Sequence, residues 1–168
     1  QLTSGSITGS SGVLTSTSAY DMQAGSVSAI LSGAVGLTKT TTGTVTLTGA
    51  NLYTGLTTVS AGILNIQNAS ALGTVAAGTS VASGAALELQ GGITTLAEAL
   101  TLNGTGVSNG GALRNIGGNN DFAGLVTLGG AARVNSDAGT LTLSNTGAIT
   151  GSGLGLTIGG AGNTTINS

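Results

Sequence analysis

The sequence contains no cysteine, histidine, tryptophan or proline. Because cysteine and histidine are absent, Ser-His-Asp and Cys-His catalytic sites and the usual zinc sites are impossible. Charged residues make up 5% of the 168 residues, and aromatic residues make up 2%. An ordinary globular domain is about one quarter charged and fills its core with aromatic rings. The composition is therefore not that of an ordinary globular domain.

Charge is too scarce in this chain to indicate a charged partner. The net charge is −2, and there are 3 lysines and arginines in total. Without a basic patch, nucleic acid is not expected as a partner. No apolar run approaches the roughly 20 residues of a membrane-spanning helix. The sequence begins with Gln1 rather than methionine, so we interpret it as a processed product or an excised segment.

Small and aliphatic residues are abundant, and they alternate with polar ones. Glycine occurs 32 times and the mean hydropathy is +0.42, so the chain can bury apolar surface without large side chains. The recurring unit is apolar-x-apolar, then a polar or small residue, then glycine or asparagine. A period of two points one face of a strand inward, and glycine or asparagine allows a tight corner. The unit occurs at 45–49, 64–68, 87–91, 100–104, 126–130, 141–145 and 156–160.

The spacing of these units predicts a solenoid. The start positions lie roughly 13 to 26 residues apart, which is too irregular for a strict hexapeptide helix. Two or three strands per turn and about 20 to 27 residues per turn fit better, and they give about six to eight turns. The absence of proline agrees, because proline would remove a hydrogen bond from strands that pair on both edges. We predict an all-β solenoid that forms a single segment over residues 1–168.

The clearest unit is 37–73, which reads LTKTTTGTVTLTGANLYTGLTTVSAGILNIQNASALG. The stretch resembles the autotransporter-associated β-strand repeat, also called the passenger-associated transport repeat. It departs from the family pattern at Thr41 and Val45, and Leu52 and Leu56 are larger than usual there. The matching positions are Leu37, Lys39, Gly43, Thr44, Thr46, Leu47, Gly49, Asn51, Tyr53, Gly55, Thr57, Val59, Gly62 and Leu64. Residues 111–115, 131–143 and 159–167 resemble the sequence around such repeats in very large bacterial surface proteins.

The resemblance implies a right-handed parallel β-helix in the secreted passenger of a type V secretion system. It places the protein outside the cell, on the bacterial surface, either anchored in the outer membrane through a barrel elsewhere in the full protein or released. A role in supporting export and in building a surface stalk or adhesin follows from the same resemblance. The expected partners are neighbouring coils of the same parent chain or stacked copies, and a host or cell-surface glycan or protein.

No residue is predicted to be catalytic, and none is predicted to bind a cofactor or a metal. Glu88 and Glu98 are a carboxylate pair that could flank a glycosidic bond. Glu88 alternates with Leu87 and Leu89, so we expect it on the outer face of its strand and in contact with solvent.

Arg114, Asp121, Arg133 and Asp137 form the one charge cluster of the sequence. Arg133 and Asp137 are close in sequence, and Arg114 lies about one turn earlier. We interpret the cluster as a ladder of arginine–aspartate pairs between adjacent turns, which stabilises their stacking modestly. A sugar-binding or catalytic site that uses the same residues is the alternative.

Three other features are given a structural interpretation. Residues 117–121 (GGNND) are similar to a calcium-binding nonapeptide, but Asn120 replaces a glycine and Asp121 comes one position early. Tyr53 is expected to pack at a corner. Asparagines that begin N-x-[ST] sequences are interpreted as stacked side chains that hydrogen-bond along the solenoid. They are Asn68, Asn103 and Asn163.

The leading functional interpretation is a structural segment, not an enzyme. A self-assembling extracellular filament or sheath subunit is the alternative, because uncapped strand edges would stack end to end. A weaker alternative is binding of ice or glycan by threonines that alternate at 38–48, 15–17 and 140–142, with Gly43 breaking the longest run at a corner. These pairs do not recur at one position of the turn, so we expect the array to be patchy. An enzyme acting on polysaccharide is the weakest interpretation, because acid and base groups are so few.

Overall fold

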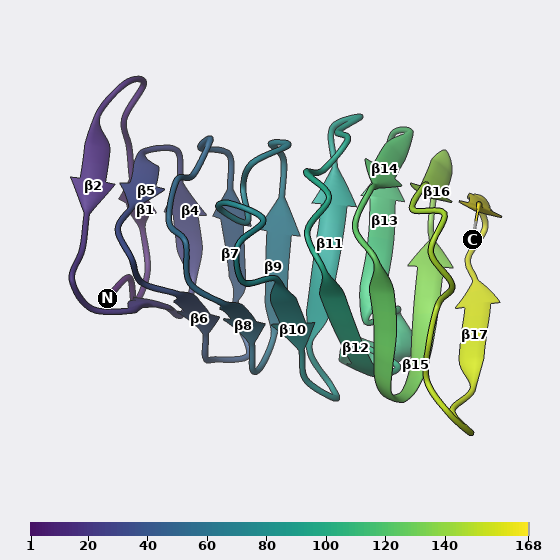
Figure 1. Cartoon of the computed structure of the whole chain (residues 1–168). Helices are drawn as coiled ribbons and strands as arrows, with labels where there is room; N and C mark the ends of the chain where they lie inside the picture. Colours follow the sequence, from purple (N-terminus) through teal and green to yellow (C-terminus); the bar gives the residue numbers. More distant parts are fainter. Residues whose placement is uncertain (168) are drawn as a thin grey trace.

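The structure is a parallel β-solenoid of about eight turns. It is a computed structural model that describes residues 1–167. Figure 1 shows the turns stacked side by side in sequence order, with the two chain ends at opposite ends of the stack. No helix among the described residues is long and apolar enough to cross a membrane. The prediction of an all-β solenoid with about six to eight turns is confirmed.

Each turn has three sides, which we call the first, second and third face. The first face contains β3 (Tyr20–Met22), β6 (Leu37–Lys39), β8 (Thr57–Val59), β10 (Thr79–Val81), β12 (Leu100–Gly104) and the start of β15 (Val126–Ser136). The second face contains β1 (Ser6–Ile7), β4 (Gly25–Val27), β7 (Thr44–Leu47), β9 (Ile63–Ile66), β11 (Ala86–Gln90), β13 (Leu113–Gly117), the end of β15, and β17 (Leu156–Gly159). Because β15 runs along both faces, it joins them into one 13-stranded sheet.

The third face is less regular than the other two. Its strands are β2 (Val13–Thr15) paired with β5 (Ile30–Ser32), and β14 (Asn120–Phe122), β16 (Thr140–Leu143) and β18 (Asn163–Ile166) paired in that order. Between these two groups, the chain crosses the third face without a regular strand.

The core is a set of aliphatic columns inside the solenoid. On the second face, one inward position is occupied in successive turns by Val45, Leu64, Leu87, Leu113 and Val134, all of them 0% exposed. Adjacent strands lie about 4.8 Å apart, so each branched side chain contacts the equivalent one in the next turn. This geometry explains how small and medium side chains alone build a continuous core.

The corners explain both the glycine content and the uneven spacing. Gly62 has φ +66°, and a Cβ there would clash with the carbonyl oxygen of Thr41 in the preceding turn. Residues 40–43 form the corner between β6 and β7, so the alternating threonine run is broken there, as predicted.

Register partners on the first face are 17 residues apart at the shortest (Tyr20 and Leu37) and 26 at the longest (Leu100 and Val126). The lower limit of about 20 residues per turn was therefore wrong. The shortest turn joins β5 to β6 with residues 33–36 alone, whereas the longest contains the 105–112 corner with a 3-10 turn, η1 (Val107–Asn109).

Candidate functional site

A charged ladder lies on the outer side of the second face. Strands β9, β11, β13 and β15 hold Asn65, Glu88, Arg114 and Asn135 as register partners, one from each of four successive turns. Arg114 Nη1 is 3.1 Å from Glu88 Oε1, and Arg114 Nη2 is 2.5 Å from Asp137 Oδ2. The ladder therefore couples β11, β13 and the end of β15 through side chains as well as through the backbone.

Amide side chains extend this ladder at both ends. Asn65 Nδ2 lies 3.4 Å from Glu88 Oε2, and Asn135 Nδ2 donates to Asp137 Oδ1 at 2.5 Å. Hydrogen bonding to Asp137 raises the pKa of Arg114, although partial burial opposes that shift. The arginine is therefore held as a cation between two carboxylates, and all its recorded partners are other members of the ladder.

The predicted orientation of Glu88 is correct, but the prediction that it is solvated was wrong. Leu87 and Leu89 are 0% exposed on the inner side, so Glu88 points outward. It is nevertheless only 6% exposed, because Asn65 and Arg114 stack against it from the strands on either side.

Glu98 is not paired with Glu88. It lies just before β12, is 2% exposed, and accepts a hydrogen bond of 2.7 Å from the hydroxyl of Thr79 on the inner side of β10. Burial raises the pKa of Glu98 to about 7. One carboxyl is thus outside the second face and the other is inside the solenoid. The two cannot flank one glycosidic bond.

The predicted charge cluster is confirmed in part. Arg114 and Asp137 do pair between adjacent turns, as the ladder interpretation required. Arg133 donates to Asn135 instead, at 3.0 Å. Asp121 lies on β14 of the third face, where its register partner is Thr142, so it is separated from the second-face ladder.

The first face presents an uncharged row of hydroxyl groups. From β6 onward, each turn places one hydroxyl residue at the same outward position, in register with the next. In β3 the same position is occupied by Asp21, the register partner of Thr38, so the row begins beside a carboxylate. The alternating threonine pairs themselves lie on different faces, with 15–17 and 140–142 on the third face and Thr38 on the first, so the row is built from single residues that the pairs did not indicate. The row is Thr38, Thr58, Ser80, Thr101, Thr127 and Thr150.

The repeat carries polar side chains inside the solenoid, which sequence reasoning missed. Lys39 is 0% exposed, and its Nζ donates to the carbonyl oxygen of Ala61 at 3.1 Å and to that of Thr41. Asn51 accepts a hydrogen bond from the Leu31 amide at 2.9 Å and donates to the Ala71 carbonyl at 2.6 Å. The available signal was the alternation itself, which puts Lys39 on the same side as Leu37.

The asparagines have mixed roles. Asn103 donates to Val81 O of the neighbouring turn at 2.9 Å, so it does hydrogen-bond along the solenoid, but its partner is a backbone carbonyl and not a stacked asparagine. Asn68 accepts the Ser70 amide within its own turn, so that interpretation was wrong for Asn68. In the turn that is similar to a calcium site, the side-chain oxygens of Asn119 and Asn120 accept backbone amides of adjacent turns.

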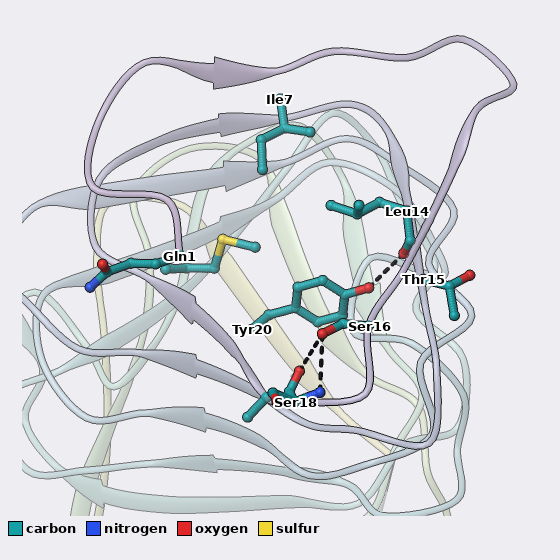
Figure 2. A pocket seen from close by; sticks show the side chains of 9 residues that line it. Gln1, Ile7, Leu14, Thr15, Ser16, Ser18 and Tyr20 are labelled. Carbon is teal, nitrogen blue, oxygen red and sulfur yellow. Dashed lines mark hydrogen bonds between the residues drawn. The ribbon is translucent and has the colours of Figure 1, made fainter.

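A cavity of about 320 Å³ opens at the first turn, beside Tyr20. Figure 2 shows Tyr20 pointing toward Leu14, whose carbonyl oxygen accepts its hydroxyl at 2.5 Å. The side chains that line this cavity are aliphatic, aromatic, thioether, hydroxyl and amide groups.

Comparison with known proteins agrees with the repeat geometry. Residues 37–66 match the family model described as Passenger-associated-transport-repeat. The Adhesin BmaC autotransporter of Brucella suis biovar 1 (strain 1330) is 37% identical over 75 residues, which are 45% of this chain and 2% of that adhesin. The chain thus spans a very small part of that relative's length. No solved structure matches the chain. The resemblance of this stretch to an autotransporter passenger repeat is confirmed.

Proposed function

We propose that the chain is a structural segment of a bacterial autotransporter passenger and forms a rigid extracellular rod, not an enzyme. The observation that carries this proposal is the unbroken ladder of the second face, where β1, β4, β7, β9, β11, β13 and β15 pair in succession. The passenger repeat at 37–66 is built into the same sheet through β6, β7, β8 and β9. A secreted or surface-exposed location accords with that repeat and with the adhesin relative.

Rigidity follows from the way the turns are joined. An inner strand of the ladder is hydrogen-bonded on both edges, so bending the stack would break backbone bonds in several turns together. The buried aliphatic columns and the Glu88–Arg114–Asp137 ladder oppose the same motion. In the parent protein, such a rod would hold an adhesive tip away from the outer membrane, where it meets a glycan or protein target.

Support of export is a second part of this proposal. A completed turn offers strand edges on which the next turn can form, so folding can proceed along the chain as it emerges. Each added turn also buries apolar side chains, so sliding of the exported chain back toward the cell becomes unfavourable.

Cryo-electron microscopy of the 168-residue chain tests the rod. We expect isolated thin rods, monomeric by analytical ultracentrifugation. A compact particle would contradict the proposal, and continuous fibres with a repeat of about 4.8 Å would replace it by the self-assembling filament. Ser80→Pro removes a backbone donor from β10 and should disrupt the rod, whereas Ser80→Thr at the same site should not.

Binding of an extended, uncharged ligand such as a glycan or ice is a second candidate function. The specific observation that favours it is the hydroxyl row of the first face, whose members repeat at the strand spacing of about 4.8 Å. Co-sedimentation with insoluble polysaccharides and thermal hysteresis measurements test the two ligands. The double variant Thr58→Val, Thr101→Val should abolish binding, while Thr142→Val on the third face should not. If the wild-type chain shows neither binding nor hysteresis, this candidate fails.

A further inference from the structure

A line of polar groups runs through the otherwise aliphatic interior. Thr57 and Thr79 are register partners on adjacent strands of the first face, and both point inward, with exposures of 0% and 2%. The next turn places Leu100 at that position. The Tyr53 hydroxyl lies 2.7 Å from the Thr57 hydroxyl, and the Thr79 hydroxyl donates to Glu98 at 2.7 Å. The line therefore ends on a buried carboxyl group.

Within residues 1–167, no cation faces Glu98. The Lys39 ammonium is bound to carbonyl oxygens at the corner between the first and second faces, and Arg114 and Arg133 lie on the outer side of the second face. The titratable group nearest along the polar line is Tyr53, which stays neutral because burial raises its pKa. A carboxylate at this position has one side-chain hydroxyl donor, no counter-ion and only 2% exposure, so burial favours the neutral acid over the charged form.

The backbone around Glu98 is tightly packed against the next turn. A Cβ on Gly124 would clash with the carbonyl oxygen of Glu98, so these two segments are in close contact. Asp121 lies nearby on β14, where it alternates with the buried Asn120 and Phe122, and its Oδ1 is shielded from solvent without a hydrogen-bond partner. Residues 91–99 have no regular strand. They are joined to the neighbouring turns by the Thr94–Asp121 bridge and by backbone hydrogen bonds from the Leu96 amide to Ala69 O and from the Thr79 amide to Ala99 O. Movement of Glu98 toward water would therefore disturb both 91–99 and the 123–125 segment above it.

We propose that Glu98 is a proton-operated lock on this turn of the solenoid. With the carboxyl protonated, the polar line is neutral and 91–99 is held against β10 and Gly124. When the proton leaves, the carboxylate is driven toward solvent and this crossing of the third face loosens. Glu98 lies in the middle of the stack, so its protonation state determines how strongly the turns on either side are coupled.

The direction of the pH dependence follows from the two states of the chain. The unfolded carboxyl titrates near 4.5, whereas burial raises the pKa of Glu98 in the folded chain to about 7. Between these values the folded chain holds a proton that the unfolded chain has lost, so stability is complete below about pH 4.5 and falls until about pH 7. A difference of this size changes the unfolding equilibrium about 300-fold across the window.

Urea denaturation of the 168-residue chain between pH 4 and 8.5, with hydrogen exchange of β10 and 91–99, tests the lock. The wild-type chain should lose stability over this window, with exchange accelerating first in 91–99. Glu98→Gln, which cannot ionise, should abolish that loss. Glu88→Gln is the matched control, because it removes the outer carboxyl and should keep the wild-type pH dependence.

A direct titration keeps the proposal testable even where a variant folds poorly. Carbon-13 NMR of the glutamate carboxyls in the wild-type chain should show one group titrating near neutral pH. Thr79→Val should move that titration to still higher pH, because the hydroxyl that stabilises the carboxylate is gone. Titration of the Glu98 carboxyl near 4.5, or an unchanged pH profile in Glu98→Gln, would overturn the proposal.

Discussion

The polar side chains inside the passenger repeat and the charged ladder outside the turns that follow it find their partners in different ways. In 37–73, Lys39 and Asn51 point into the solenoid, and their partners are backbone groups, all of them in other turns except the carbonyl of Thr41. In 86–137, Glu88, Arg114 and Asp137 lie on the outer side of the second face, and their partners are one another. The first arrangement fixes the path of the backbone, whereas the second joins strands that already pair.

The difference predicts unequal costs for similar deletions. A backbone amide inside the solenoid that loses its side-chain partner has no water to replace it, so the full desolvation penalty is felt. A group on the outer side can be hydrated again once its neighbour is truncated. Removal of a neutral side chain from the inside of the repeat should therefore be more destabilising than removal of a side chain from the outer ladder.

The largest effect is expected for Asn51→Ala. The substitution leaves the Leu31 amide and the Ala71 carbonyl without partners, which should cost about 3 kcal/mol of unfolding free energy. Urea denaturation followed by circular dichroism measures it. Asn68→Ala is the matched control, since Asn68 binds the Ser70 amide in its own turn and should cost about 1 kcal/mol or less. Equal losses in the two variants would show that an asparagine bonded to other turns contributes no more to stability than one bonded within its own turn.

Arg114→Ala should come second, at about 2 kcal/mol, because it leaves the Glu88 carboxylate largely buried and without its cation. The loss should shrink in 1 M salt, where the screening length falls to about 3 Å. The Asn51→Ala loss should not respond to salt in this way. Arg133→Ala removes one recorded hydrogen bond, to Asn135 on the same strand, and serves as control. A salt-independent loss in Arg114→Ala would show that the ladder acts by packing and not by charge.

The strand alternation predicted the fold well, because it depends on local sequence. Each apolar-x-apolar unit that was identified falls on or beside a strand, and the number of turns followed from their spacing. The third face was less predictable, since crossings such as 91–99 have no alternation to read.

The candidate sites were harder to predict, because they depend on which residues of different turns become neighbours. Glu88 was correctly placed outward, but Asn65 and Arg114, which cover it, lie 23 and 26 residues away. The hydroxyl row was missed for the same reason: its members are separated by 20 residues between Thr38 and Thr58 but by 26 between Thr101 and Thr127. Turn lengths that vary in this way are set by the corners, and the corner insertions carry no periodic signal.

Lys39→Met sharpens the comparison from within the repeat. The substitution removes the hydrogen bonds to the carbonyl oxygens of Thr41 and Ala61, but it also relieves the desolvation of an ammonium whose pKa is lowered by burial. We expect a net loss of about 1.5 kcal/mol, below that of Asn51→Ala. Lys39→Ala, which also leaves a cavity, should be worse. If Lys39→Met were the most destabilising of these variants, the charged Lys39 and not the neutral Asn51 would contribute most to holding the backbone inside the repeat.

The smallest effect is expected for Tyr53→Phe, about 0.5 to 1 kcal/mol. Only the hydroxyl is lost, and Thr57 can still donate to Leu72 O at 3.4 Å. The ring keeps its tilted contact with Tyr20, at a centroid distance of 6.3 Å, and its packing under Gly73. Tyr53→Leu removes the ring and should cost about 3 kcal/mol or more in the same urea experiment. Equal losses would mean that the hydroxyl line to Thr57, and not the corner packing of the ring, is what the repeat requires of this tyrosine.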